Sequence, residues 1–269
     1  MVSAGLATGA VAATAVIIVL TAYQGGTSSG ARADDTGHEH SVDTVRHTRG
    51  APPDPESSAE PESGAEPDYD DWMAATFPLD PQLTGSGELV PVGGSAPAAD
   101  PDATTLLRYR VDVEEGLPVN PEFFAEAVHR TLNDERSWGN DGERGFARVS
   151  SGHYDFVITL ASPGTTAEWC ARSGLDTTQS NVSCDAATTE RVMINAWRWA
   201  LGSETYGDDI RGYRQMLINH EVGHRIGYGH SDCAADGAPA PVMMQQTKFL
   251  TSPVTGLTCV PNPWPHPAG

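Results

Sequence analysis

The sequence predicts an α+β fold, with one sheet and a few helices, followed by an irregular C-terminal part. Three observations lead to this prediction. Short apolar or alternating runs, typical of strands, are interleaved with longer segments of helical periodicity. The chain beyond Gly227 is rich in proline and glycine and shows no sustained period. Residues 85–269 are together long enough to bury one hydrophobic core.

The first predicted strand and helix are neighbours in the sequence. LLRYRVDVE, residues 106–114, alternates between apolar and polar side chains and predicts a strand. The segment NPEFFAEAVHRTL predicts a helix that ends at about Leu132. Asn120 is a typical N-cap, and Pro121 suits the first helical position, where the amide that proline lacks would have no partner.

Two more strands and a long helix follow. YDFVITLAS, residues 154–162, predicts a strand, and RVMINAWRW, residues 191–199, predicts another whose end could also be helical. GDDIRGYRQMLINHEVGHRI predicts one helix from about Asp208 to Ile226. Gly227 then ends this helix, because glycine readily takes the left-handed conformation of a C-cap.

The N-terminal part of the chain divides into an apolar segment and a polar spacer. Residues 1–24 are mostly apolar, and a span of ~20 apolar residues can cross a bilayer. A secretory signal peptide is the other interpretation, with LTA at 20–22 or ARA at 31–33 as cleavage sites. Residues 25–84 are acidic and rich in Pro, Ser and Glu, which predicts a disordered spacer. We therefore expect an exported protein that is either anchored in the cell membrane or secreted.

The net charge excludes one class of partner. The chain carries a formal charge of −20 at pH 7. Nucleic-acid binding needs basic side chains that neutralise phosphates, so we expect none. We expect a monomer that contacts the membrane through its N-terminal segment only.

The stretch INHEVGHRIGYGH has the spacing of a catalytic zinc site. His220 and His224 lie four residues apart and share one face of a helix, where two imidazoles can chelate one Zn²⁺. Glu221 lies beside this face and can hold a water next to the metal. Gly227 lets the chain turn back, so that His230 can supply a third ligand. Three protein ligands leave a position open for water, as in catalytic zinc sites.

The same residues also have a purely structural interpretation. Both helical histidines could be ordinary core residues, since they share an apolar stripe with Tyr213 and Leu217. Glu221 could pair with Arg225, its i+4 neighbour on the helix. The offsets of the glycine and the third histidine favour the zinc site, because the extended motif arises by chance far more rarely than a bare HExxH.

The segment HEVGHRIGYGH, from His220 to His230, resembles HExxHxxGxxH, the zinc motif of the metzincin metalloproteases. Metzincins also have a methionine turn under the zinc ligands. PVMMQQ resembles it, with Met243 the better fit and Met244 the alternative. Some metzincins place a tyrosine two residues after this methionine, where the present sequence has Gln245. The domain, with its INHEVGH, PVMMQQTK and PNPWP stretches, is also similar to a family of exported bacterial proteins with a metzincin-like domain.

The resemblance implies a metzincin-like fold, with a mixed twisted sheet, an active-site helix and an irregular C-terminal subdomain. It also implies a zinc-dependent endopeptidase in which His220, His224 and His230 bind one Zn²⁺. Glu221 would act as general base toward a water that the metal activates. Two alternatives stay open: a surface module that binds zinc and catalyses nothing, and a zinc hydrolase of a non-peptide amide in the cell wall.

Four cysteines in the predicted domain indicate two disulfides in an exported chain, and three pairings are possible. We favour Cys170–Cys184 and Cys233–Cys259, because these pairs close short loops. The second bond would brace the chain after His230 against the C-terminal tail. Cys233 could instead act as a zinc ligand.

Overall fold

The computed structural model describes residues 67–267. The predicted apolar segment, residues 1–24, and most of the predicted acidic spacer lie outside this range. Within the described range, no helix is both long enough and apolar enough to cross a membrane.

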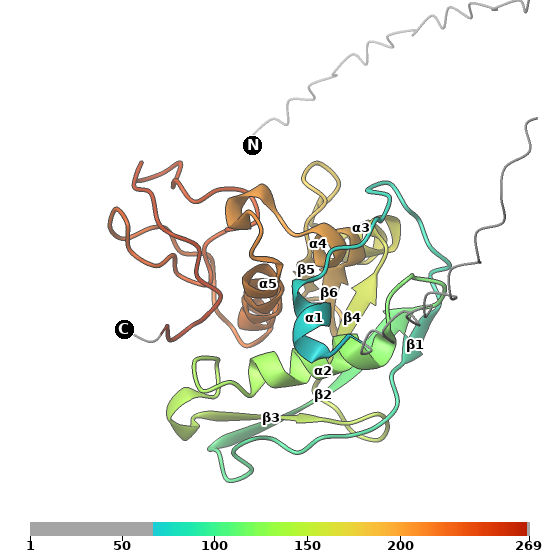
Figure 1. Cartoon of the computed structure of the whole chain (residues 1–269). Helices are drawn as coiled ribbons and strands as arrows, with labels where there is room; N and C mark the ends of the chain where they lie inside the picture. The colour runs from blue at the N-terminus through green and yellow to red at the C-terminus, as the bar shows by residue number, and fades with distance from the viewer. Residues whose placement is uncertain (1–66, 268–269) are drawn as a thin grey trace, which may run out of the picture. The chain divides into compact units, whose positions relative to one another are not determined.

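Six strands of the described part form one mixed sheet (Figure 1). The strands are β1 Leu89–Pro91, β2 Thr105–Glu114, β3 Arg144–Arg148, β4 Phe156–Ala161, β5 Cys184–Ala186 and β6 Arg191–Asn195. The order across the sheet is β1-β2-β4-β6-β5, and β3 pairs in parallel with the first half of β2. β4 lies parallel to β2 and to β6, whereas β1 and β5 run antiparallel to their neighbours. The mixed α+β class is therefore confirmed, while the likeness to metzincins stays a prediction.

Helices cover both faces of this sheet. They are α1 Tyr69–Ala74, α2 Pro121–Leu132, α3 Pro163–Ala171, α4 Ala196–Leu201 and α5 Ile210–Arg225, with the short 3₁₀ helices η1 Asn140–Gly142 and η2 Glu204–Tyr206. Successive side chains of a strand point to opposite faces of the sheet. Val192 and Ile194 of β6 belong to the main core, which includes residues of α2 and α5. Met193 packs in a smaller cluster with Cys170 of α3. Consequently α5 and α3 lie on opposite faces of the sheet.

The elements predicted from periodicity are largely confirmed. β2, β4 and α2 lie where expected, and the Asn120 side chain accepts a hydrogen bond from the amide of Phe123 at 2.9 Å. For residues 191–199 the predicted strand with a helical end is confirmed, because β6 ends at Asn195 and α4 begins at Ala196. The Asn195 side chain accepts a hydrogen bond from the amide of Trp197 at 3.0 Å and so caps α4. The strands β1, β3 and β5 were not predicted, since so few residues show no clear period.

The folded part begins earlier in the chain than predicted. Residues 67–84 were assigned to the spacer, but α1 lies among them and its Met73 is fully buried. Arg214 of α5 is also fully buried, and it donates hydrogen bonds to the carbonyls of Trp72 and Ala75 at 2.7 and 2.9 Å. These carbonyls lie at the end of α1, where a helix leaves its last acceptors without intrahelical partners. The predicted boundary was wrong because this contact joins residues about 140 positions apart, which composition does not reveal.

Both favoured disulfide pairings are confirmed. Cys170 of α3 is bonded to Cys184 of β5, and Cys233 is bonded to Cys259 in the C-terminal part. The first bond ties an edge strand of the sheet to the helix that covers it. The alternative of Cys233 as a zinc ligand is wrong, because its sulfur belongs to the disulfide.

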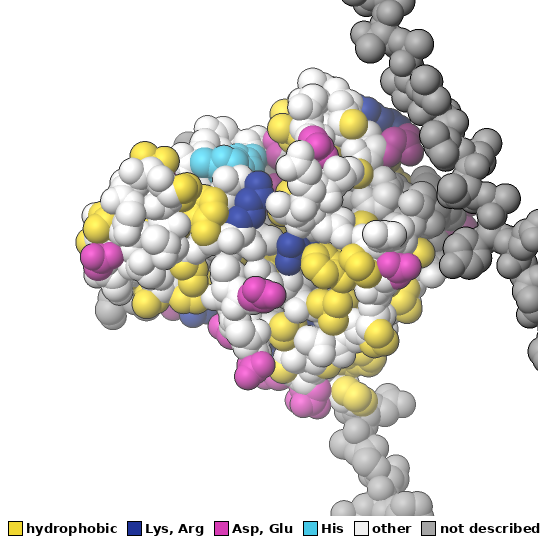
Figure 2. All heavy atoms as spheres, turned by 90° about the horizontal axis from the view of Figure 1, so that it is seen from above, with side chains coloured by type: hydrophobic (Ala, Val, Ile, Leu, Met, Phe, Trp, Pro, Cys, Tyr) yellow, Lys and Arg dark blue, Asp and Glu magenta, His cyan; other side chains and the backbone are white. Residues whose placement is uncertain are grey.

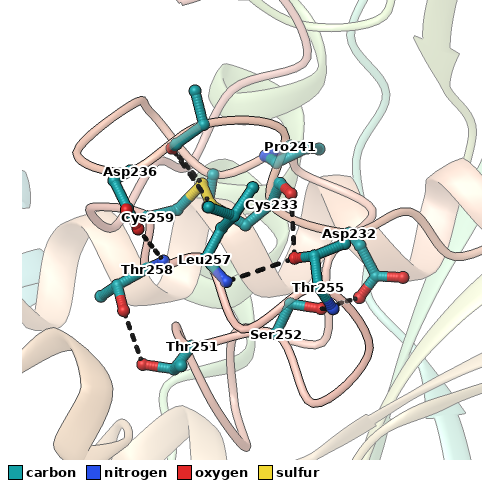
Figure 3. The surroundings of a disulfide bond; sticks show 12 residues. Asp232, Cys233, Asp236, Pro241, Thr251, Ser252, Thr255, Leu257, Thr258 and Cys259 are labelled. Carbon is teal, nitrogen blue, oxygen red and sulfur yellow. Dashed lines mark hydrogen bonds between the residues drawn. A yellow bond between two sulfur atoms is a disulfide. The ribbon is translucent and has the colours of Figure 1, made fainter.

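The loops around the second disulfide hold the chain that follows His230 (Figure 3). The hydroxyl of Ser252 donates a hydrogen bond to the carboxylate of Asp232 at 2.8 Å. The amide of Ser231 donates to the carbonyl of Met243 at 3.1 Å. The irregular C-terminal part was predicted, and these contacts show how such a segment is held without regular secondary structure.

Candidate metal centre

The end of helix α5 turns the chain back toward the helix itself. Gly227 has a φ of +101°, which confirms the predicted left-handed turn. Its amide donates a hydrogen bond to the carbonyl of His224 at 3.0 Å, and the amide of Tyr228 donates to the carbonyl of Gly223 at 2.9 Å. These bonds satisfy two of the last helical carbonyls. The reversal brings His230 back beside the helical histidines.

The three predicted histidines converge on one point. Nε2 of His224 lies 3.2 Å from Nε2 of His220 and 3.2 Å from Nε2 of His230. One ring nitrogen from each residue lies within 4.8 Å of the other two. The first histidine is buried, the second half-buried and the third exposed, so the cluster opens to solvent on one side. Figure 2 shows histidine side chains grouped at the molecular surface.

Hydrogen bonds to backbone carbonyls determine which ring nitrogens carry protons. Nδ1 of His220 lies 2.9 Å from the carbonyl oxygen of Val242, and Nδ1 of His224 lies 2.9 Å from that of Tyr228. A carbonyl oxygen only accepts, so each Nδ1 carries the proton and each Nε2 presents a lone pair. Two lone pairs at 3.2 Å repel each other unless a cation lies between them.

Burial also favours the uncharged form of two of the three histidines. It lowers the pKa of His220 to about 3, with smaller contributions from the neighbouring histidines, and it lowers the pKa of His230. Neutral imidazoles with a fixed Nδ1–H and converging Nε2 atoms are the donor set that zinc and similar transition metals take. The residues of this site therefore fit such an ion, and an ordinary core histidine has no need of this convergence.

Glu221 lies beside the cluster and is nearly buried, with 5% of its surface exposed. Burial raises the pKa of Glu221 to about 8, and the negative charge of Asp185 contributes to the rise. A divalent cation close by would favour the ionised carboxylate and oppose this shift. Because this pKa lies near neutral pH, the Glu221 carboxyl group can gain or lose a proton when its surroundings change slightly.

The surface partner expected for Glu221 is engaged elsewhere. Arg225 forms an ion pair with Asp185 of β5 and donates hydrogen bonds to the carbonyls of Thr189 and Arg191 at 2.9 and 3.0 Å. Among residues 67–267, the carboxylate of Glu221 takes part in no ion pair. The structural interpretation of Glu221 as half of a helical surface pair is therefore wrong.

The two candidate methionines face different surroundings. Met243 belongs to the main core, and its Sδ would lie 2.4 Å from a Cβ atom added at Gly223 of α5. Met244 instead packs in the cluster of the Cys233–Cys259 bond. Of the two, Met243 is the one that packs beneath the histidine helix, and its role as a methionine turn stays a prediction.

A cavity of about 400 Å³ opens beside the histidines and Glu221. Its other walls are β5 with the loop before it and the segment 245–248. Gln245 lines the cavity at the position where some metzincins have tyrosine. β5 was missed because three residues give no period, although the disulfide at Cys184 was a signal that this segment is held in place.

Replacing Gly223 with alanine should displace the side chains that pack against the histidine helix. The new Cβ would lie 2.4 Å from Met243 Sδ and 2.8 Å from Trp138 Cζ2, so both side chains must move. We expect a loss of about 1–3 kcal/mol in the free energy of unfolding, measured by urea denaturation, together with weaker zinc binding. Gly229→Ala, in open space within the same motif, is the matched control and should change neither quantity.

A second substitution tests whether contact with Met243 causes these losses. In a Gly223→Ala, Met243→Ala double variant the shorter side chain makes room for the new Cβ. The losses should then be less than additive in a double-mutant cycle. Full additivity would show that Met243 does not contact the helix at Gly223.

Comparison with models of protein families places the chain in a family. A family model described as "Protein of unknown function (DUF3152)" matches residues 79–267. No curated protein and no solved structure matches the chain. The match covers the sheet, all three histidines and both disulfides, but its description carries no activity.

Proposed function

Since the chain belongs to the DUF3152 family, whose description names no activity, we propose a function from its own site: an exported zinc-dependent metallopeptidase. His220, His224 and His230 would hold the zinc ion, and Glu221 would act as the general base. One observation carries the proposal. Three Nε2 atoms converge beside a buried carboxylate at the wall of one cavity.

The zinc ion and Glu221 would have different roles in the reaction. When bound, zinc would polarise the carbonyl of the scissile bond and make a water more acidic. The Glu221 carboxylate would accept a proton from that water and return it to the nitrogen of the leaving amine. Its burial beside the cluster keeps it out of surface ion pairs and free for this transfer.

Strand β5 would bind the substrate in extended form. It lies at the end of the sheet, and in the described part its ladder partner is β6 alone. Cys184 and Asp185 of this strand line the cavity beside the histidines. An edge strand presents unpaired backbone groups, to which a peptide can add as a further strand. The Cys170–Cys184 bond would hold this edge in place.

The disulfides support the proposed location. All four cysteines of the chain are in disulfide bonds, which is consistent with an oxidising environment outside the cytoplasm. Membrane anchoring or secretion depends on residues outside the described range. We propose that the domain acts as a monomer on a peptide or protein outside the cell.

The proposal predicts that zinc content and peptide cleavage go together. Full-length protein, purified oxidised, should bind one zinc ion per chain and cleave members of a mixed peptide library. A chelator should remove both, and added zinc should restore both. Metal analysis measures the zinc content, and mass spectrometry of the products measures peptide cleavage.

The other outcomes separate the alternatives. Bound zinc without cleavage of any peptide would favour a zinc-binding surface module or a cell-wall amide as substrate. Cross-linked cell-wall fragments, offered to the same protein, would then distinguish these two. Absence of stoichiometric zinc would contradict the metal site itself.

A further inference from the structure

One basic side chain lines the cavity beside the histidines. Lys248 is the only lysine of the chain, and it lines the cavity from the segment that follows the methionine pair. Its side chain is exposed, and among residues 67–267 it forms no ion pair. Figure 2 shows basic side chains close to the histidine group on this face.

The nearby carboxylates of the cavity are already engaged. Asp176 accepts hydrogen bonds from the amide and the hydroxyl of Thr178 at 2.9 and 2.6 Å. Asp185 is paired with Arg225. The remaining carboxylate, Glu221, lies buried beside the histidines. The positive charge of the lysine is therefore left for a ligand rather than for the protein.

The backbone that carries Lys248 is held in position. The carbonyl of Thr247 accepts a hydrogen bond from the hydroxyl of Ser203 at 2.7 Å. The side chain of Gln246 donates to the carbonyl of Asn262 at 2.8 Å. The amide of Lys248 itself donates to the carbonyl of Gln245. The anchored backbone fixes where the Lys248 side chain starts, and its flexible stem lets the ammonium group adjust to a substrate group.

The lysine lines the same cavity as all three histidines and Glu221. The apolar lining near it includes Leu175 and Met216. Such a lining suits the aliphatic stem of a side chain that ends in a charge.

We propose that Lys248 selects substrates that present a carboxylate next to the scissile bond. The carboxylate would belong either to an acidic side chain or to the C-terminus of a short peptide. This inference rests on the proposed peptidase function. Because the whole chain carries −20, it repels anions at long range, so the preference must come from short-range contact with this one ammonium group.

Paired peptides test the proposal with the full-length, oxidised, zinc-loaded protein. Each pair differs by Glu or Gln at one position near the scissile bond, and each peptide is made with a free and with an amidated C-terminus. We expect the ratio of kcat/KM, Glu over Gln, to be about fivefold or more at low salt and to fall as salt rises. A preference that follows the free C-terminus instead would identify the terminal carboxylate as the group recognised.

Three variants assign the preference to the lysine. Lys248→Met keeps the length of the side chain and should bring the ratio close to one, whereas Lys248→Glu should favour Lys over Gln at the same position. Arg108→Met, which removes an exposed positive charge from β2, is the control and should keep the parental ratio. Equal zinc content and circular dichroism spectra show that all variants are folded.

A binding measurement keeps this inference separate from the proposed activity. If no peptide is cleaved, the Kd values of the Glu and Gln peptides are measured by calorimetry for the parent and for Lys248→Met. Tighter binding of the Glu peptide that is lost in the variant supports recognition by Lys248 even when the peptidase proposal fails. Equal ratios in the parent and in Lys248→Met, for both cleavage and binding, would overturn it.

Discussion

Glu221→Gln is expected to lower kcat/KM for peptide cleavage by about 10²–10⁴-fold while the zinc content stays at one ion per chain. The glutamine side chain has nearly the same shape, so it should fit the buried site beside the histidines. It cannot accept a proton from the attacking water or return one to the leaving amine. The three Nε2 atoms that would hold the ion are untouched by this change.

The measurement pairs steady-state kinetics with metal analysis on the same sample. Glu190→Gln, which removes an exposed carboxylate from the turn before β6, is the matched control and should keep the parental rate. Parental turnover in Glu221→Gln would show that this residue is not the base. Lost zinc in that variant would make it part of the metal site instead.

Arg214→Met should lower the free energy of unfolding by about 3 kcal/mol or more. Arg214 is fully buried, and its guanidinium donates to the carbonyls of Trp72 and Ala75 in and just beyond α1 and to that of Trp199 in α4. Methionine fills part of the volume but leaves these buried carbonyls without donors. Urea denaturation of the oxidised protein measures the loss, and limited proteolysis should show earlier cleavage within residues 67–84.

The neighbouring arginine on the same helix provides the comparison. Arg211 also reaches α1, through an ion pair with Asp70 at 2.6 Å, but its side chain is 39% exposed and that of Asp70 is 68% exposed. Arg211→Met should therefore cost at most about 1 kcal/mol. Similar losses in the two variants would contradict the view that buried hydrogen bonds of Arg214, rather than charge on this helix, hold α1 in place.

Features that depend on neighbours within a few residues were predictable from the sequence. The i, i+4 spacing of His220 and His224 follows from the helical period, and the turn at Gly227 follows from the conformational freedom of glycine. Together, this spacing and this turn predict that His230 lies beside the other two histidines. The pairing of the cysteines was also predictable, because each bond closes a short loop. These outcomes depend on local geometry, which the sequence states directly.

Other features depend on contacts between distant segments. The sequence offered Arg225 as the partner of Glu221, but packing of β5 against α5 pairs this arginine with Asp185. It also left Met243 and Met244 as alternatives, and the fold separates them into different clusters. In each case the local pattern allows two outcomes, and burial against another element decides between them.

The sequence by itself determined the helix, its end, the histidine triad, the disulfide pairing and the α+β class of this protein. Only the tertiary structure decided that residues 67–84 belong to the domain, that β5 forms an edge of the cavity and that Lys248 lines it. The physical reason is the distance along the chain over which each kind of interaction acts. Periodicity and turn chemistry act over a few residues, whereas the side chains that share a cavity are selected by the packing of the whole chain.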